Sequence, residues 1–513
     1  MLQLPDLHAS DNTQLVLGAA ACLGLIGVIS KAYLSKSQSG LPLPPTPPTW
    51  RLRGHFVPLN NPFLTVAAWI DQHGPLITIR SGFSKTVIVG RHNAAVEIME
   101  KQGAFTADRP RFVAAGEMLF GGLSIIFTPV GSRLRRMRRA LHSNLQPKVA
   151  EEYQPLQMSY AKETVLNILR DPYNFQNHAA TYSATTIKRI AYGKTSATLA
   201  TDPEVLEIRE HLRVLRTTAR PGAYLVESFP WLKHVPGYGR ELKKGFPRVW
   251  RIYTSQLNRV KQQMQDNVDG GPSFVKYMLK NPQVHELSET EMAFLAGTFV
   301  TAGTETTSMA ICTVFMAAAC FPEEQAKVHA ELDAIIGKDR APTFADYQTL
   351  PRLQAFVSEA LRWRPLAPSG VAHRTTQDVI WGNYCIPGGT TVVADHWSIS
   401  RDPDVFPEPE AFKPQRWVND QGRTRDDMKF YLYGFGRRVC PGQEVANRSL
   451  FINAALVLWA FQLTRDPTKP LNDMGYMNGA MDKIRPCAIE FKTRIPETEL
   501  RHMMQNYPEA ARD

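Results

Sequence analysis

The chain has 513 residues, 43% of them apolar, and no low-complexity linker divides it after residue 50, so we expect one large globular unit behind a short leader. Its six cysteines include no CxxC pair and no framework of close spacings, which argues against a disulfide scaffold or a zinc finger and favours a reducing compartment. The formal net charge of +11 is compatible with a nucleic acid, an anionic membrane or an acidic protein as partner, and composition alone does not choose among them.

An uncharged apolar run near the start, LVLGAAACLGLIGVI, predicts a transmembrane anchor helix over residues 13–30, at the short end of what spans a bilayer. No Lys or Arg precedes this run, whereas basic residues follow it from Lys31, so the positive-inside rule places residues 1–12 in the lumen and the bulk of the protein in the cytosol. A cleaved signal peptide is the alternative, but the basic segment that it needs before the apolar run is missing.

The segment after the anchor, residues 31–50, is basic and then rich in proline, ending in LPLPPTPPTW. Prolines fix φ and favour a stiff extended spacer over a helix. We therefore expect a hinge that holds the globular body, residues 51–513, at a set angle to the bilayer.

The body is predicted to be mainly helical with a small β portion. PLITIRSG and KTVIVG, around residues 75 to 90, are rich in β-branched residues and predict two short strands. Helical periodicity dominates from about 150 to 335, and further strand candidates flank the Pro-Gly-Gly turn at 387–389 and lie near residue 488.

One loop, PGAYLVESFPWLKHVPGYG at 221–239, interrupts the helices and carries Phe229, Trp231 and Leu232 between prolines. Exposed aromatic side chains in an anchored protein can enter the membrane interface. The alternative is that they cover a core under a long loop.

The densest basic run lies in VGSRLRRMRRALH, with arginines at 133, 135, 136, 138 and 139. The run is brief, whereas nucleic-acid binders usually carry broader basic stripes with interleaved aromatic residues, so we expect no nucleic-acid partner. By default these arginines form a solvated basic face.

Two segments further along the chain carry charged or hydroxyl side chains in helical patterns. FVTAGTETT lies in the middle of an apolar helix, where a threonine often bonds the carbonyl four residues back and opens the helix locally. In VSEALRWRP, Glu359 and Arg362 are three residues apart on one helical face, close enough for an ion pair of a common and weak kind.

A single cysteine, Cys440, stands among glycines and arginines in YGFGRRVCPG. A cysteine thiolate is a good ligand for iron, and a strongly donating axial thiolate favours O–O bond cleavage at haem. Gly436 and Gly442 would let the backbone approach a flat porphyrin, and Arg438 can form a charge-assisted bond with a propionate. Taken alone, the cysteine could equally be a buried structural residue.

Together these motifs resemble the cytochrome P450 family, from the anchor to about residue 490. The family's haem-binding signature FxxGxRxCxG is met by Tyr433, Gly436, Arg438, Cys440 and Gly442, with Tyr in place of Phe at the first position. The added hydroxyl requires a partner or water. The resemblance implies the P450 fold, a helical prism around haem b with a small β subdomain, preceded by one transmembrane helix, and Cys440 as the axial ligand of the iron.

The central helix matches the family's (A/G)Gx(D/E)T(T/S) element at Ala302, Gly303, Glu305, Thr306 and Thr307. In the resemblance, Ala302 and Gly303 leave room for O2 over the iron. Thr306 hydrogen-bonds the dioxygen during its activation and Glu305 relays protons inward, so these two are the candidate catalytic residues.

The remaining cofactor contacts also come from the resemblance. Arg416 in FKPQRW matches the PxRx element, which closes a structural network with Glu359 and Arg362 behind the haem. Arg138 stands where the WxxxR helix binds a propionate. His373 in VAHRTTQD aligns with another propionate contact, and its neighbour Arg374 is the alternate.

Leu134 stands where the WxxxR helix usually has its Trp, so we expect propionate binding to depend more on Arg138 and Arg438. The other arginines of this segment border the thiolate side in the family, where an acidic reductase docks. A partner patch and a solvated basic face therefore both stay open for them.

Family placement also gives candidate walls for the substrate pocket, for any of which ordinary core packing is the alternative. They are Phe112, Met118, Phe120, Phe299, Val300, Val371 and Met481. Apolar walls with almost no placed charge suit a lipophilic substrate such as a terpenoid, a polyketide or a steroid. FPWLKHVPGYG and VAHRTT resemble members from fungal secondary metabolism.

The resemblance implies a haem-thiolate monooxygenase that inserts one atom of O2 into a lipophilic small molecule. It would be anchored in the endoplasmic reticulum membrane with a cytosolic catalytic domain, and NADPH-cytochrome P450 reductase, with cytochrome b5 as a further donor, would supply the electrons. Two alternatives stay open: a reductase-independent isomerase or dehydratase of a hydroperoxide, and a non-catalytic haem-binding membrane protein. Neither needs the Glu305 and Thr306 pair.

Overall fold

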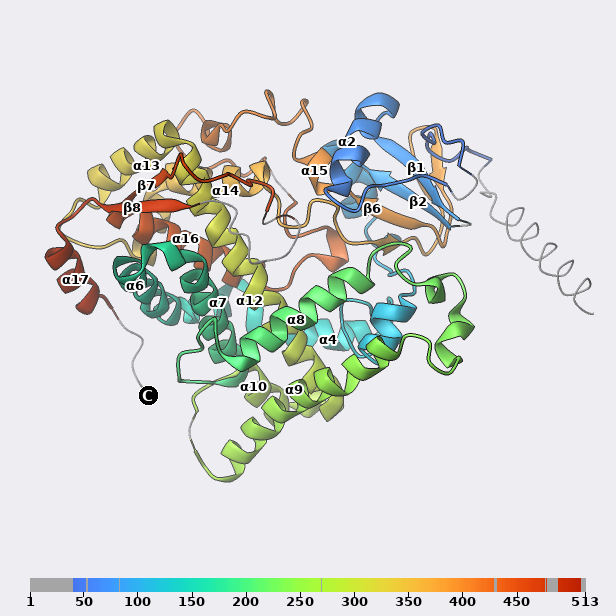
Figure 1. Cartoon of the computed structure of the whole chain (residues 1–513), viewed down its shortest axis with the longest axis horizontal. Helices are drawn as coiled ribbons and strands as arrows, with labels where there is room; N and C mark the ends of the chain where they lie inside the picture. Colours follow the sequence, from blue (N-terminus) through green and yellow to red (C-terminus); the bar gives the residue numbers. More distant parts are fainter. Residues whose placement is uncertain are drawn as a thin grey trace, which may run out of the picture.

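The computed structural model describes residues 40–508 except 52–53, 83, 269, 429–430, 476 and 478–487. The predicted lumenal segment, the anchor helix and residues 31–39 of the hinge lie outside the described residues. Most of the described chain is helical; β1, β2 and β6 lie at the upper right of Figure 1, and β7 and β8 lie at its left. This architecture agrees with the predicted mainly α fold.

The principal sheet has the strand order β1-β2-β6-β3, and two further two-stranded sheets complete the β portion. The strands are β1 (Leu76–Ser81), β2 (Ser84–Val89), β3 (His373–Arg374), β4 (Val379–Trp381), β5 (Tyr384–Ile386), β6 (Thr391–Ala394), β7 (Phe461–Arg465) and β8 (Ile489–Thr493). β1 and β2 are antiparallel, whereas β2 and β6, some 300 residues apart in the sequence, pair in parallel with Val87 opposite Val392. The structure contains strands at each of the predicted positions.

Helices make up the rest of the framework, several of them beginning at a proline in the first turn, where a missing N–H costs nothing. The α-helices are α2 (Pro62–His73), α3 (His92–Ala95), α4 (Ser132–Leu145), α5 (Pro147–Glu152), α6 (Gln154–Arg170), α7 (Phe175–Tyr192), α8 (Pro203–Thr218), α9 (Arg240–Gln265), α10 (Phe274–Lys280), α11 (Pro282–His285), α12 (Glu289–Cys320), α13 (Pro322–Ile335), α14 (Pro351–Trp363), α15 (His396–Ile399), α16 (Gln443–Ala460) and α17 (Glu497–Gln505). Short 3-10 and π-helical segments are η1 (Val96–Lys101), η2 (Val113–Leu119), η3 (Pro172–Asn174), η4 (Leu225–Glu227), η5 (Pro230–His234), η6 (Phe344–Thr349), η7 (Pro414–Trp417) and η8 (Gly436–Arg438).

Helix α12 is the central element, and it runs through the middle of the molecule in Figure 1. A capping box begins it: the Ser288 hydroxyl accepts from the Glu291 N–H, and the Glu291 carboxylate accepts from the Ser288 N–H. Its surface is apolar nearly all round, as a helix with neighbours on every side requires, and it ends just before Pro322. Helices α7, α9, α14 and α16 pack against it.

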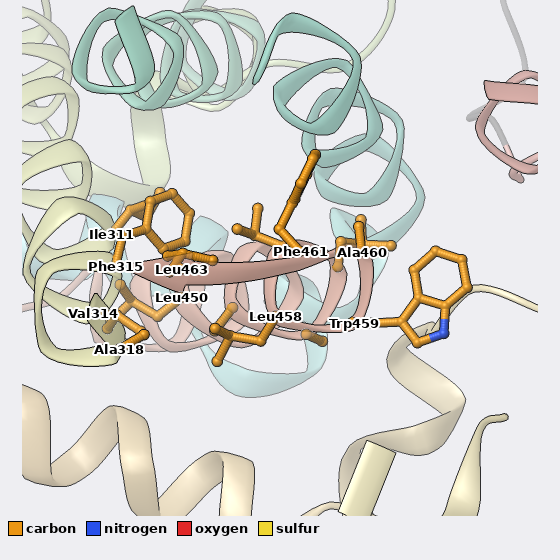
Figure 2. Close-up of a cluster of buried hydrophobic side chains, with 14 of the residues drawn as sticks. Ile311, Val314, Phe315, Ala318, Leu450, Leu458, Trp459, Ala460, Phe461 and Leu463 are labelled. Carbon is orange, nitrogen blue, oxygen red and sulfur yellow. The ribbon is translucent and has the colours of Figure 1, made fainter. Parts of the chain in front are cut away.

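The largest apolar cluster lies at the C-terminal half of α12. Figure 2 shows Ile311, Phe315 and Ala318 of α12 close to side chains of α16 and β7, among them Leu450 and Leu463. All of these side chains are buried. The cluster fixes α12 against α16, the helix that directly follows Cys440.

Within the described part of the chain, no single helix has both the length and the hydropathy of a membrane span. One pair of consecutive helices, α12 and α13, passes this test only when taken together, and the two are bent by 105° at their junction.

Candidate functional site

Cys440 lies in the turn between η8 and α16. The Cys440 N–H donates to the Tyr433 carbonyl (2.9 Å), and the Gly442 backbone N–H is hydrogen-bonded to the thiol. Burial among protein atoms raises the pKa of the Cys440 thiol, while that N–H and the Arg138 charge act in the opposite direction. The residue nevertheless remains exposed, so a cation that binds the sulfur would displace its proton.

The two glycines of this turn differ in how closely other protein atoms approach them. Gly436 has a φ of +50°, and a Cβ there would lie 2.8 Å from the Met99 carbonyl oxygen, so close packing on η1 requires the glycine. Its N–H donates to the Glu100 carboxylate (2.6 Å). At Gly442 a Cβ would meet the Cys440 Sγ at 3.9 Å, an ordinary contact. Packing on η1 is therefore sufficient to require a glycine at position 436.

Tyr433, the departure from the family signature, satisfies its hydroxyl within the protein. The Tyr433 O–H donates to the Asn447 Oδ1 (2.7 Å) on α16. Burial and the nearby Cys440 raise the pKa of Tyr433, so the ring stays neutral. The tyrosine thus ties the turn before the cysteine to the helix after it.

Two of the predicted propionate-binding arginines donate to backbone carbonyls around this turn. The Arg138 Nη2 on α4 donates to the Val439 carbonyl (3.1 Å), directly before the cysteine. The Arg438 Nε and Nη2 donate to the carbonyls of Ala107 (2.6 Å) and Thr128 (2.7 Å). Leu134, on the same helix as Arg138, is buried in the core and offers no donor.

A third arginine, Arg109, completes this cationic group and was missed by the sequence analysis. It is 8% exposed, and it donates to the carbonyls of Ala372 and Ile126. Burial and the nearby Arg438 lower its pKa to about 9. In the sequence Arg109 adjoins Asp108, which suggests a local ion pair, but the structure pairs Asp108 with Arg374 instead (2.6 Å).

His373 lies beside this group. Its Nδ1 is hydrogen-bonded to the Thr106 carbonyl (2.8 Å), and burial, followed by the Arg109 charge, lowers the pKa of His373 to about 3. The imidazole is therefore neutral at ordinary pH. Arg374, the alternate candidate for this propionate contact, forms an ion pair with Asp108. Of the two candidates, His373 is therefore the one without an ion pair among the described residues, and it lies within the influence of the Arg109 charge.

The middle of α12 presents different residues on different faces. Ala302 and Thr306 are exposed although α12 is largely buried, and the Thr306 hydroxyl donates to the Ala302 carbonyl (2.8 Å), the back-bonding that the sequence suggested. At Gly303, in contrast, a Cβ would lie 2.8 Å from the Ile187 Cδ1 on α7. Gly303 therefore serves close helix packing, and Ala302 is the small residue on the Thr306 face. Thr307 is half-buried.

Glu305 is buried on another face of α12, where α8 packs. Its side chain is 5% exposed, and its Oε1 lies 3.1 Å from the Arg216 Nη1 of α8. The contact holds the carboxylate on the α8 side of α12.

The predicted Glu359, Arg362 and Arg416 network is present with its side chains in contact. Arg362 donates to both Glu359 oxygens (2.7 and 2.8 Å), and the Arg416 Nε lies 3.2 Å from the Glu359 Oε1. The Trp417 indole N–H donates to the same carboxylate (2.9 Å), a partner that the sequence analysis missed. The two fully buried charges, Glu359 and Arg362, are thus compensated by geometry that satisfies both groups.

The predicted pocket residues are divided between core and surface. Met118, Phe120 and Val300 are buried in apolar clusters, Phe112 and Phe299 are half-buried beside one of them, Val371 is exposed and Met481 lies outside the described residues. For the buried three, core packing accounts for the burial. Phe112 and Phe299 are the placements that leave part of the ring accessible.

The loop at 221–239 is tied to η2, the segment that follows Phe112. The Glu227 carboxylate accepts from the backbone N–H groups of Val113 (3.1 Å) and Ala114 (2.9 Å). The Lys233 ammonium lies 2.6 Å from the Glu117 carboxylate. These contacts satisfy free amides at the start of η2 and fix the loop over it.

The family model described as Cytochrome P450 matches residues 44–490. The chain belongs to the cytochrome P450 family. The match covers β1 to β7, α12 and the cysteine turn, and it confirms the resemblance predicted from the motifs.

Several relatives are similar over nearly their whole length. The chain is 44% identical to cytochrome P450 monooxygenase 113 of Postia placenta over 94% of this chain and 98% of that protein. It is 43% identical to cytochrome P450 monooxygenase 64 of the same organism, over 95% and 98%. With cytochrome P450 monooxygenase FrzL of Cladobotryum sp the identity is 32% over 93% and 91%. The predicted enzyme class, a cytochrome P450 monooxygenase, is confirmed.

Membership of this family implies a haem with a thiolate ligand, O2, an electron donor and a small-molecule substrate. The residues present fit such a group. Cys440 offers an accessible thiol, and among the described residues no carboxylate forms an ion pair with Arg109, Arg138 or Arg438, which leaves their charges for the propionates. When bound, the haem supplies an iron centre that binds O2 and takes up single electrons.

Proposed function

We propose that this P450 hydroxylates, or oxidises in a related way, a lipophilic small molecule in a secondary metabolic pathway. The proposal that the protein activates O2 rests on one observation: Thr306 lies on an exposed face of α12, and the neighbouring Glu305 is buried. An isomerase or dehydratase of a hydroperoxide would not need an acid and an alcohol at adjacent positions. A protein that only binds haem would not need them either.

Different residues of the chain would bind the cofactor, transfer protons and bind the substrate. Arg109, Arg138 and Arg438 bind and orient the cofactor through its carboxylates, and Cys440 holds the metal. Thr306 holds and passes a proton at its Oγ1, and Glu305 supplies protons from the α8 side. Apolar side chains such as Phe112 and Phe299 exclude water and bind substrate by burial of apolar area.

The lipophilic substrate is supported by the character of the candidate walls. The half-buried rings of Phe112 and Phe299 belong to apolar surroundings in which Phe127 and Phe274 are their aromatic neighbours. The relatives come from fungi such as Postia placenta and Armillaria gallica, which supports the secondary-metabolic assignment, and terpenoids, polyketides and steroids are the classes that we would test first.

Electrons would come from NADPH through a cytochrome P450 reductase, with cytochrome b5 as a second donor. Arg135 and Arg139 are exposed on α4, the helix whose Arg138 contacts the residue before the cysteine. A surface pocket of about 580 Å³ is lined in part by Tyr433 and Val439 of the cysteine turn. An acidic partner would meet complementary charge at the exposed arginines of α4.

Membrane attachment at the endoplasmic reticulum, through a helix over residues 13–30, is part of the proposal. Leu225, Phe229 and Trp231 of the green loop are exposed, and so is Trp50 at the start of the described chain. Both segments lie toward the right of Figure 1. Apolar side chains at this side would enter the interface of a bilayer that the anchor holds close.

The test is the absorption of the ferrous carbonyl complex together with turnover. We expect the purified protein to show the band of a thiolate-ligated haem, and Cys440→Ala to lose it because no other described thiol adjoins the arginine group. Cys320→Ala, which removes a half-buried thiol elsewhere, is the control and should keep the band.

Turnover separates the remaining alternatives. Lipophilic candidates are first screened by their shift of the haem Soret band, and binders are then incubated with reductase, NADPH and O2. Oxygenated product that requires NADPH supports the proposal. Product formed from a hydroperoxide without NADPH identifies an isomerase or dehydratase, and an unchanged spectrum in Cys440→Ala would refute the ligand assignment.

A further inference from the structure

A surface pocket of about 500 Å³, the α8–α9 pocket, lies between helices α8 and α9. Leu119 of η2, His211 of α8 and Gly245 of α9 are among its lining residues. Its charged lining residues are three acids and three bases: Glu207, Glu210, Glu241, Lys244, Arg248 and Arg251. Because these charges balance and the volume is that of a small-molecule site, the pocket suits an uncharged ligand.

His211 is the unusual residue on the buried face of α8. The other side chains of this face are apolar or satisfied: the Thr218 hydroxyl, for example, donates to the Val214 carbonyl (2.7 Å). His211 is 8% exposed, and its Nε2 is buried without a hydrogen-bond partner among the described residues. Burial lowers the pKa of His211 to about 4, so the imidazole is neutral at ordinary pH.

Another buried histidine shows what a purely structural role looks like in this chain. The His285 Nε2 is hydrogen-bonded to the Met278 carbonyl (2.9 Å), and its Nδ1 accepts from the Leu287 N–H (3.2 Å). Both ring nitrogens of His285 are thus satisfied within the protein. An unpaired buried nitrogen is unfavourable, so the His211 Nε2 requires a partner that the described residues do not supply.

The His211 ring also contacts the aromatic side chains that include a candidate substrate wall. It meets the edge of Phe120, with 4.8 Å between the ring centroids. Phe120 lies 6.1 Å from Phe127, and Phe127 lies 4.9 Å from Phe112, whose half-buried ring is one of the proposed substrate contacts. His211 therefore lies between the α8–α9 pocket and these apolar side chains.

Resting on the proposed monooxygenase function, we propose that His211 is a specificity-determining residue whose Nε2 hydrogen-bonds a hydroxyl or carbonyl oxygen of the substrate. The α8–α9 pocket gives the oxygen-bearing end of the molecule access to this ring, and the phenylalanines bind its apolar part. The substrate is then a lipophile that already carries oxygen, and a bare hydrocarbon is disfavoured. An earlier reaction must have introduced or retained that oxygen.

The experiment compares probes that share a carbon skeleton and differ in one oxygen function. Menthol and menthone are compared with p-menthane, and cedrol with cedrane, by titrating the Soret shift of the full-length haem-loaded protein. We expect His211→Phe, which keeps a planar ring beside Phe120 but removes both nitrogens, to weaken the oxygen-bearing probes about tenfold, or about 1.4 kcal/mol. The hydrocarbons should stay within about twofold of wild type.

Two further variants separate hydrogen bonding from packing. His211→Gln places an amide near the position of Nε2 and should restore most of the affinity for the oxygen-bearing probes. Arg213→Gln is the control on the same helix, since Arg213 is exposed and pairs with Glu210, and it should change neither class of probe. The carbonyl-complex band should be retained in all three variants.

Equal weakening of both members of each pair in His211→Phe would show that the ring only packs, and unchanged affinities would show that water is its only partner; either result would overturn the proposal. So would the failure of every oxygen-bearing probe to shift the wild-type band, or loss of the carbonyl-complex band in both His211→Phe and His211→Gln. These measurements need no NADPH. Absence of NADPH-dependent product from a bound probe would instead count against the monooxygenase function.

Discussion

At the residue scale, Thr306 and Cys440 are each held by contacts to the backbone, and each side chain is also accessible to a ligand. Among the residues that the structure describes, the Thr306 hydroxyl is bound only to the Ala302 carbonyl. A hydrogen bond of this kind contributes about 1 kcal/mol net, so exchange with another partner is inexpensive. Cys440 is held by backbone contacts of its own turn. Both side chains are positioned by the backbone and remain accessible.

Thr306→Ala is expected to keep the haem and divert reducing equivalents to peroxide. The substitution removes the hydroxyl but leaves the Ala302 carbonyl, which already accepts the backbone bond of α12, so the fold is preserved. Peroxide and product are measured per NADPH, with Thr306→Ser as the control that retains the hydroxyl. Fully coupled product formation in Thr306→Ala would refute the proton-relay role.

At the scale of elements, short segments supply or hold hydrogen-bond partners of buried carboxylates. The Glu359 carboxylate of α14 receives Arg416 and Trp417 from η7, besides Arg362 from its own helix. At the start of α15, the Asp395 Oδ2 accepts from the N–H (3.0 Å) and the hydroxyl (2.7 Å) of Ser398. The first carboxylate has cationic partners, whereas the second is buried with hydroxyl and amide donors.

The Asp395 carboxyl should make stability depend on pH. Burial raises its pKa from 3.8 to about 7, against the lowering effect of its hydrogen bonds to Ser398 and of the Arg401 charge. The folded state therefore binds this proton more tightly than the unfolded chain does, so the contribution is full below the ordinary carboxyl range and is lost as pH rises toward 7.

We expect Asp395→Asn to change this pH dependence. The amide keeps an acceptor oxygen for Ser398 and carries no charge, so the variant should gain stability over wild type as pH rises from about 4 to 7, by up to about 4 kcal/mol above pH 7. Urea unfolding across this range measures it. A stability difference that stays constant with pH would contradict the argument, and the neighbouring His396, buried with a pKa lowered to about 4, affects both proteins alike.

At the scale of the whole molecule, one apolar cluster connects the C-terminal half of α12, which follows Thr306, to α16, the helix that follows Cys440. Phe315 lies at its centre, 6.4 Å from the Phe175 ring and 6.3 Å from the Phe491 ring, centroid to centroid. Ile311 and Leu450 complete the contact in Figure 2. Because both functional helices share this cluster, its packing fixes their separation.

Phe315→Ala should lower the free energy of unfolding by about 3–5 kcal/mol, because a large side chain is lost from a site that is closely packed on every side. Urea denaturation followed by circular dichroism measures the loss. Val284→Ala, at a 39% exposed position, is the control and should change stability by under about 0.5 kcal/mol. Equal midpoints for the two variants would contradict the central place of Phe315.

Sequence patterns predicted the features that depend on residues close together in the chain. Strand positions, the apolar α12 and the adjacency of Glu359 and Arg362 follow from β-branched runs, periodicity and helical spacing. The family match followed from motif order. For the anchor over residues 13–30 the sequence prediction stands untested, since that segment lies outside the described chain.

Contacts between distant segments could not be predicted from those patterns. Gly436 is required by Met99, and Gly303 by Ile187, each more than a hundred residues away. The ion pair of Glu305 with Arg216 likewise joins two helices whose relative placement depends on tertiary packing. The sequence shows which residue types are present, but it does not show which distant segments will pack against them.

The attachment of Glu227 to the amides of Val113 and Ala114 has a consequence for protein engineering. A chimaera that receives only residues 221–239 from a relative would lose the acceptor for two amides elsewhere in the chain, unless the donor also carries a carboxylate there. Segments 112–120 and 221–239 are therefore one unit of recombination, and libraries that aim to alter substrate range should exchange them together.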